Sequence, residues 1–208
     1  MNQDIHDSID RLCNYFRNVD IGPPASSENL DALKTSFAYI PEEVESFYST
    51  FDGISVGIDD NVSGEILDLG FSLSQTPMPY YYDDPEQYLP IQSDGCGSWH
   101  CLVLRSGFGA GSVIFLDHEV DKGPAYLLAG SLHGYFGMWT DHLIFRHDRD
   151  GRMYPECRPV ELDKWPWLSR PKKDHPWPFD LEWMKENDPA AQVLIEDPRF
   201  LEWIRPEV

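Results

Sequence analysis

The stretch that decides the fold class is Ile40-Pro41-Glu42-Glu43-Val44-Glu45-Ser46-Phe47-Tyr48-Ser49-Thr50-Phe51-Asp52-Gly53-Ile54-Ser55-Val56-Gly57-Ile58. Its first part predicts a helix, because apolar residues recur at the spacing of one helical face. Those residues are Val44, Phe47, Tyr48 and Phe51. Pro41 suits the first turn of a helix, the glutamates after it suit the positive end of the helix dipole, and Gly53 suits the helix end. From Gly53 to Ile58 apolar residues alternate with small or polar ones, which is typical of a strand.

Two further helices are predicted on the amino-terminal side of this stretch. Residues 5–16 carry four apolar side chains at helical spacing. Residues 22–24 read Gly-Pro-Pro and end that element. Ser26 and Ser27 then offer an N-cap to a second helix that extends to Phe37.

The carboxyl-terminal side predicts strands that are separated by tight turns. Besides residues 54–58, the predicted strands are 65–69, 98–104, 112–117, 125–129 and 142–147, with a brief ordered run at 89–91. Residues 74–88 contain three prolines and are predicted to form a loop. Ser131 can cap a short helix that ends near Trp139. The pair Asp150-Gly151 predicts a hairpin turn after the last strand.

The end of the chain differs in composition from the rest. Residues 155–178 contain six prolines and three tryptophans, and two Asp-Pro pairs at 188–189 and 197–198 predict short helices. Helices followed by antiparallel strands and then by helices indicate the α+β class. We expect amino-terminal helices packed on a mainly antiparallel twisted sheet of about six strands. Residues 1–154 would form this domain, and the Pro/Trp-rich arm and short helices of residues 155–208 would pack on it.

Charge is distributed unevenly along the chain. The net charge is −20, from 36 acidic and 16 basic residues, and no basic residue occurs between Lys34 and Arg105. Those 70 residues carry twelve acids together with many aromatic and aliphatic residues, so they predict a folded core with a negative exterior. Such an exterior opposes binding to nucleic acid or anionic lipid and accelerates encounter with a cationic protein. Solubility is the alternative explanation of the same charge.

The composition also indicates the compartment. Residues 1–4 show no basic leader before an apolar run, and no apolar run in the chain is long enough to span a membrane. The four cysteines form no Cys-x-x-Cys pair. We therefore expect a cytoplasmic protein with reduced thiols.

Three segments have some features of chemical sites, but each has a simpler structural explanation. Residues 107–112 are rich in glycine, yet a strand follows them and no lysine is present, so they do not predict a phosphate-binding loop. On a strand, Asp117 and Glu119 face one side while His118 faces the other, and two ligands are too few for a metal. Residues 148–151 lack the ligand spacing of a calcium loop and suit a turn. We expect no enzymatic activity, no metal and no cofactor.

Three segments, taken in order, resemble the motifs of the SUKH superfamily. They are the helix and glycine of residues 40–53, the Leu-Pro-Ile to Asp-Gly-Cys-Gly-Ser segment of residues 89–98, and the strand of residues 113–119 that ends in Asp-His-Glu. The predicted helix 131–139 lies where that superfamily has a helix. The resemblance covers about residues 26–142 and excludes the arm from residue 155 onward. One glycine, Gly53, follows the helix of the first of these segments, where the superfamily often has two.

The resemblance implies a binding scaffold without catalytic activity. Bacterial members are mostly immunity proteins that neutralise toxins, often nucleases, and eukaryotic members include a yeast regulator of cell-wall assembly. We therefore expect an immunity protein that binds a basic toxin domain. The alternative is a regulatory or scaffolding module that binds a host protein.

Aromatic residues divide into expected core residues and expected partner anchors. Trp99 and Trp139 lie in periodic apolar segments and are expected in the core. The tyrosine triplet lies in a polar, proline-flanked loop, where Tyr can anchor a partner and neighbouring acids can steer it. The residues expected to bind the partner are Asp59, Asp60, Tyr80, Tyr81, Tyr82, Asp83, Asp84 and Glu86.

Overall fold

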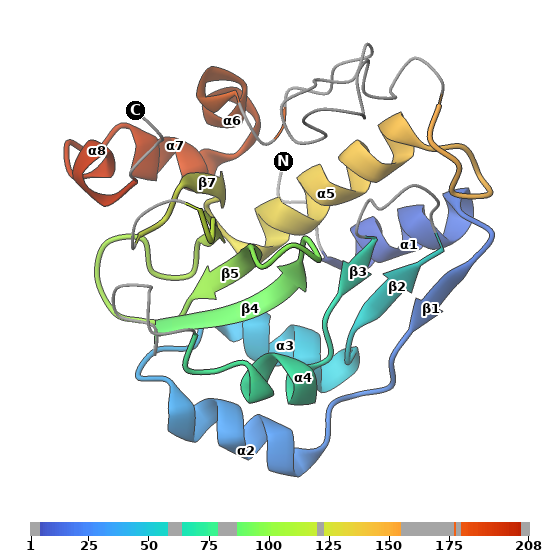
Figure 1. Ribbon diagram of the computed structural model, residues 1–208, viewed down its shortest axis with the longest axis horizontal. Helices are drawn as coiled ribbons and strands as arrows, with labels where there is room; N and C mark the ends of the chain where they lie inside the picture. Colours follow the sequence, from blue (N-terminus) through green and yellow to red (C-terminus); the bar gives the residue numbers. More distant parts are fainter. Residues whose placement is uncertain are drawn as a thin grey trace.

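The computed structural model describes residues 5–57, 64–78, 87–119, 123–154, 177 and 180–204. Within them the fold is α+β, as the sequence predicts, with helices and two antiparallel sheets (Figure 1). The helices are α1 (Ile5–Tyr15), α2 (Ser27–Ser36), α3 (Glu42–Thr50), α4 (Leu69–Ser74), α5 (Leu132–Arg146), α6 (Leu181–Asn187), α7 (Pro189–Ile195) and α8 (Phe200–Trp203). The strands are β1 (Val19–Ile21), β2 (Ile54–Val56), β3 (Glu65–Ile66), β4 (Tyr88–Ser93), β5 (Trp99–Val103), β6 (Val113–Leu116) and β7 (Tyr126–Ala129).

The strands follow one another in space in the order in which they occur in the chain. One sheet has the order β1-β2-β3 and the other the order β4-β5-β6-β7, with antiparallel pairing throughout. The two sheets lie side by side (Figure 1), and the backbone N–H of Leu67 donates to the Ile91 carbonyl across 2.9 Å. The sheet that the sequence predicts is therefore divided into two parts that meet at β3 and β4.

The helices α1, α3 and α5 enclose the core on one side. The apolar face of α1 buries Ile9 and Leu12 as α1 packs along α5. The rings of Phe47 on α3 and Phe136 on α5 lie 5.0 Å apart between centroids. Trp139 is 2% exposed, which confirms its predicted place in the core, whereas Trp99 is partly buried and packs against the core's edge.

Residues 142–146 are helical, so the strand predicted over residues 142–147 is wrong. The helix α5 continues from Leu132 to Arg146, well past the expected end near Trp139. Leu143 lies one turn beyond Trp139 and is also buried, so the apolar face of the helix continues. His147 then forms an isolated antiparallel bridge with Met153, and the intervening residues form the predicted turn.

Two more boundaries differ from the sequence prediction. The strand predicted over residues 65–69 ends at Ile66, because Asp68 caps α4 by accepting the N–H of Phe71 at 2.8 Å. Near the carboxyl end, α7 begins at Pro189 as predicted, whereas α8 begins at Phe200 and not at residue 198. Helix α6 is an element that the sequence analysis did not identify.

The carboxyl-terminal helices lie beside β7, at one end of the four-stranded sheet (Figure 1). Trp177 is the one described residue of the Pro/Trp-rich arm, and its indole N–H donates to the Leu128 carbonyl on β7 at 2.7 Å. This aromatic residue is therefore fixed to the sheet. None of the helices that the structure describes is both long and apolar enough to cross a membrane.

Candidate functional site

The residues predicted to bind a partner all lie outside the part of the chain that the structure describes. They are Asp59, Asp60, Tyr80, Tyr81, Tyr82, Asp83, Asp84 and Glu86. That prediction therefore stays a prediction. The described residues contain three other arrangements that join distant segments of the chain: a polar network at the end of the four-stranded sheet, a carboxylate at the start of α5, and a groove beside that carboxylate.

The polar network begins with a tight turn between β4 and β5. The Asp94 carboxylate accepts the backbone N–H groups of Cys96 at 2.7 Å and Ser98 at 2.9 Å. Gly95 and Gly97 have φ values of 76° and 110°, a region that favours glycine over other residues. The glycines permit the turn, and Asp94 satisfies the backbone donors that the turn leaves unpaired.

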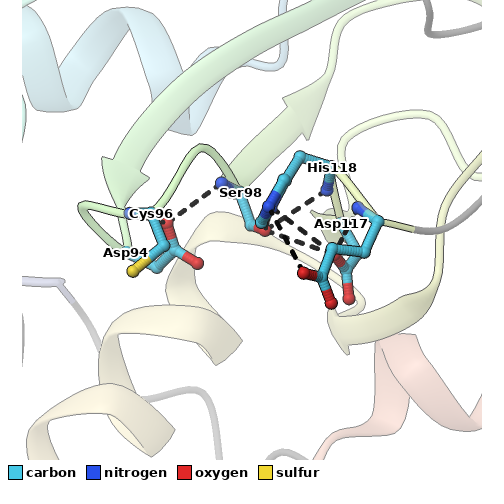
Figure 2. A network of polar contacts seen from close by, with 6 residues as sticks. Asp94, Cys96, Ser98, Asp117 and His118 are labelled. Carbon is cyan, nitrogen blue, oxygen red and sulfur yellow. Dashed lines mark hydrogen bonds and ion pairs between the residues drawn. The ribbon is translucent and has the colours of Figure 1, made fainter.

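The turn is tied to the end of β6 through Ser98. Its hydroxyl oxygen lies 2.8 Å from Nδ1 of His118 and 3.4 Å from Oδ1 of Asp117, and it accepts the backbone N–H of His118 at 3.3 Å. Asp117 also accepts the N–H of Glu119 at 2.9 Å. Figure 2 shows the two segments facing each other. Two of the three segments that resemble SUKH motifs, residues 89–98 and 113–119, are therefore linked to each other by these hydrogen bonds.

The sequence analysis expected the side chain of His118 to face away from those of Asp117 and Glu119, and this expectation is wrong. The ring nitrogens of His118 lie 3.7 Å from Asp117 and 3.8 Å from Glu119. The physical reason is that β6 ends at Leu116, so strand alternation no longer applies to the next residues.

This hydroxyl, imidazole and carboxylate set has the residue types of a hydrolytic triad but a different setting. Ser98 is only 2% exposed, and its oxygen already accepts a backbone N–H. A nucleophile needs an open approach to its substrate. The contacts instead hold a strand end against a turn.

The second arrangement joins α3 to the start of α5. The Glu43 carboxylate accepts the backbone N–H groups of Leu132 at 2.9 Å and His133 at 3.2 Å. Its Oε2 also lies 2.6 Å from Nδ1 of His133, while the side chain of Ser131 caps the N–H of Gly134 at 3.0 Å. These contacts satisfy donors that every helix leaves unpaired in its first turn, and a carboxylate there is favoured by the helix dipole.

A groove of about 490 Å³ lies next to this carboxylate, between α1, α3 and the start of α5. Its wall carries carboxylates, imidazoles and aromatic rings. The residues lining it are Ile5, His6, Tyr39, Pro41, Glu42, Glu43, Ser46, Phe47, Phe51 and His133. A volume of this size suits a small ligand or the side chains of a docked loop.

A smaller cavity of about 230 Å³ lies between α5 and the carboxyl-terminal helices. Its buried carboxylate, Asp188, accepts the N–H groups of Gly130, Ala190 and Ala191 at 2.8, 3.0 and 3.1 Å. All of these contacts are structural, since they cap α7 and attach it to the end of β7.

One partly buried titratable group, His100, has a lowered pKa. Tyr135 donates its hydroxyl proton to Gln92, so Nδ1 of His100 must carry the proton in its 2.7 Å contact with the Tyr135 oxygen. Burial lowers the pKa of His100 to about 4, and its ring also lies edge-on to Phe115. At neutral pH the imidazole is therefore uncharged and belongs to the core network.

The sequence analysis did not identify the groove. It interpreted Glu42 and Glu43 as residues that suit a helix dipole, and it assigned no role to His133. The signal available in the sequence is that α3 begins with Glu42 and that His133 is the second residue of α5, so both helices carry a charged or titratable residue in their first turn. Periodicity cannot show that these two helix ends meet.

Comparison with known families gives one match. The model of the SMI1 / KNR4 family (SUKH-1) matches residues 24–137, which include α2, α3, the strands from β2 to β7 and the start of α5. A search of curated protein sequences finds no match. The matched region covers more than half of the 208 residues and contains both the Ser98 cross-link and the Glu43 contact. The chain therefore belongs to the SMI1 / KNR4 family, also called SUKH-1.

Proposed function

We propose that this chain is a non-catalytic immunity protein that neutralises a basic toxin domain, such as a nuclease, by binding to it directly. Membership of the SMI1 / KNR4 family supports the proposal, because this family includes immunity proteins as well as cell-wall regulators. The observation that carries it is the separation of charges in the fold.

Basic residues gather at one end of the paired helices α1 and α5. Arg11 pairs with Asp141, and Arg17 pairs with Asp150 at 2.5 Å. The guanidinium of Arg149 donates to backbone carbonyls at the end of α1 at 3.1 Å. These cations are therefore already engaged within the protein.

The acidic residues of the central stretch are arranged differently. Among the described ones, Glu42, Glu65, Asp68 and Asp94 are exposed, and the structure records no ion pair for them within the described residues. Nuclease domains carry positive surfaces because they bind phosphates. An unpaired negative exterior can occupy such a surface and can raise the association rate constant to the order of 10⁸ M⁻¹s⁻¹ at low salt.

The test begins by purifying the tagged chain from its native host and identifying co-purified proteins by mass spectrometry. A recovered basic toxin is then titrated with the chain. A sharp end point at equal molar amounts supports neutralisation by binding, whereas inactivation of many toxin molecules by one chain would point to an enzyme.

Stopped-flow association rates measured against salt concentration test the electrostatic part. We expect the rate constant to fall steeply as salt rises, because screening weakens steering. A rate constant independent of salt would reject steering. Recovery of a host protein that is not a toxin would favour the regulatory or scaffolding alternative.

A further inference from the structure

We infer that the groove between α1, α3 and the start of α5 binds an arginine side chain of the cationic partner, with Glu42 as the carboxylate that receives it. This inference rests on the proposed function and specifies where the partner docks and which chemical group it presents. The groove lies in the part of the chain that the structure describes, and its lining contains none of the residues that the sequence analysis expects to bind the partner.

The first step concerns which carboxylate is available. Three glutamates lie in the first turn of α3. Glu45 is paired with Lys34 of α2 at 2.6 Å, and Glu43 is occupied by the start of α5. Glu42 is exposed, lines the groove and has no cationic partner within the described ranges. One negative charge at the rim of the groove is therefore left for a partner.

The second step concerns the shape and chemistry of the wall. Tyr39 is 40% exposed, although most large apolar side chains of this fold are buried. The half-buried Phe51 and the buried Phe47 also line the groove, and the ring centroid of Phe51 lies 5.1 Å from that of His6. Aromatic faces next to a carboxylate favour a cation, because the ring quadrupole and the charge act in the same direction.

The third step is the choice of arginine over lysine. A planar guanidinium can stack on an aromatic ring and present two N–H groups to one carboxylate, whereas an ammonium is a compact, strongly hydrated charge. The groove combines both features, since the exposed ring of Tyr39 and the carboxylate of Glu42 belong to the same lining.

The imidazoles that line the groove affect its net charge. Nδ1 of His133 lies 2.6 Å from Oε2 of Glu43, a carboxylate that is itself part of the wall. The ring of His6 lies edge-on to Phe51 at the α1 side. The lining thus contains two carboxylates, and one of its two imidazoles is paired with Glu43, an arrangement that suits a cationic occupant.

The test uses a peptide probe, N-acetyl-Gly-Arg-Gly-amide, titrated into the ¹⁵N-labelled full chain and followed by two-dimensional NMR. The citrulline analogue is the matched neutral probe, because it keeps the planar shape of the side chain and removes its charge. Glu42→Gln removes the proposed carboxylate, and Glu65→Gln is the matched control on β3, exposed and outside the groove lining.

We expect chemical-shift changes at the amides of α3, His6 and His133, with millimolar affinity for so small a probe. Glu42→Gln should weaken arginine binding roughly three- to five-fold, which corresponds to an exposed ion pair, and Glu65→Gln should leave it unchanged. The citrulline peptide should bind the wild-type chain about as weakly as the arginine peptide binds the Glu42→Gln variant.

Equal affinity for the arginine and citrulline peptides would overturn the inference, because the groove would then select neutral ligands. Shift changes on another surface, or none at about 20 mM peptide, would overturn it as well. If the peptide fails but a basic toxin is still neutralised, the proposed function stands and this docking site falls. If the peptide binds in the groove while no basic protein is recovered or neutralised, the site stands and the immunity function falls.

Discussion

Replacement of Glu43 by alanine should destabilise the fold far more than the same replacement one residue earlier. Glu43 is 13% exposed at its side chain, and its carboxylate accepts two backbone N–H groups at the start of α5 as well as an imidazole N–H. Glu42, its neighbour in the same turn of α3, is exposed. The two glutamates have the same intrinsic preference for a helix, so the difference between their variants isolates the contacts of Glu43.

The size of the effect follows from these contacts. Loss of a side chain that caps a helix costs about 0.5–2 kcal/mol, and an anion at a helix start contributes about 0.3–1 kcal/mol. The ion pair with His133 adds little, because His133 is 45% exposed and solvent screens the pair. We therefore expect Glu43→Ala to lower the free energy of unfolding by about 2 kcal/mol, and Glu42→Ala by less than about 0.5 kcal/mol.

Urea denaturation followed by tryptophan fluorescence measures both values on the same chain. The midpoint should shift to lower urea for Glu43→Ala with the same slope, which shows that stability has changed without a change in the unfolded state. In a thermal melt the corresponding decrease in Tm is about 4–8 °C for a chain of this size. If the two variants unfold within about 0.5 kcal/mol of each other, Glu43 does not anchor α5, and the reasoning is refuted.

Three further predictions concern other parts of the fold. Burial lowers the pKa of His100 from 6.5 to about 4, so as the pH falls the imidazole is protonated in the unfolded chain before it is protonated in the folded chain. The free energy of unfolding should therefore fall on the order of 2 kcal/mol between about pH 6.5 and 4. Urea denaturation measured across this pH range should show a smaller fall for His100→Asn. Iodoacetamide should label Cys96 in the native protein but Cys101 only after denaturation, as peptide mass spectrometry can show, because Cys101 is buried and its thiol pKa is raised. Alanine usually stabilises a helix by about 1 kcal/mol relative to glycine, yet Gly134→Ala should lower Tm, because its Cβ would lie 2.7 Å from the Asp188 carboxylate; an unchanged or higher Tm would contradict this contact.

Helices with a local start signal could be predicted from the sequence. Ser26 caps α2 by accepting the N–H of Asn29, and Asp188 with Pro189 begins α7, as their order in the sequence indicates. The apolar face of α3 is also visible as a simple period. In each case the decisive interactions join residues a few positions apart.

The second half of α5 could not be assigned in the same way. Residues 142–147 contain a short continuous apolar run, Leu143 to Phe145, which suits a buried strand as well as a helix. The helix is fixed there by distant partners. Tyr15 of α1 donates to the His147 carbonyl at 2.7 Å, and Arg11 pairs with Asp141. These contacts join residues more than a hundred positions apart, so no local pattern contains them.

Gly134 shows the same limit at a single residue. By propensity, this glycine and Gly137 weaken the helix. In the fold, Gly134 leaves room for the buried carboxylate of Asp188, which holds the carboxyl-terminal helices to β7. The low helix propensity of glycine at this position is therefore required by packing between segments that are far apart in sequence.

The adjacent glutamates of α3 separate folding from binding within one helical turn. Glu43 faces inward and satisfies the start of α5, so its loss should reduce stability in the absence of any partner. Glu42 faces the groove, so its replacement should leave the urea midpoint nearly unchanged and weaken only recognition of a cation. From the sequence, both glutamates at the start of α3 suit the helix dipole equally well. Only the position of α5 shows that they have different roles. A variant pair that exchanged these roles, with Glu42→Gln unfolding early and Glu43→Gln losing arginine binding alone, would show that α5 meets α3 through the other carboxylate.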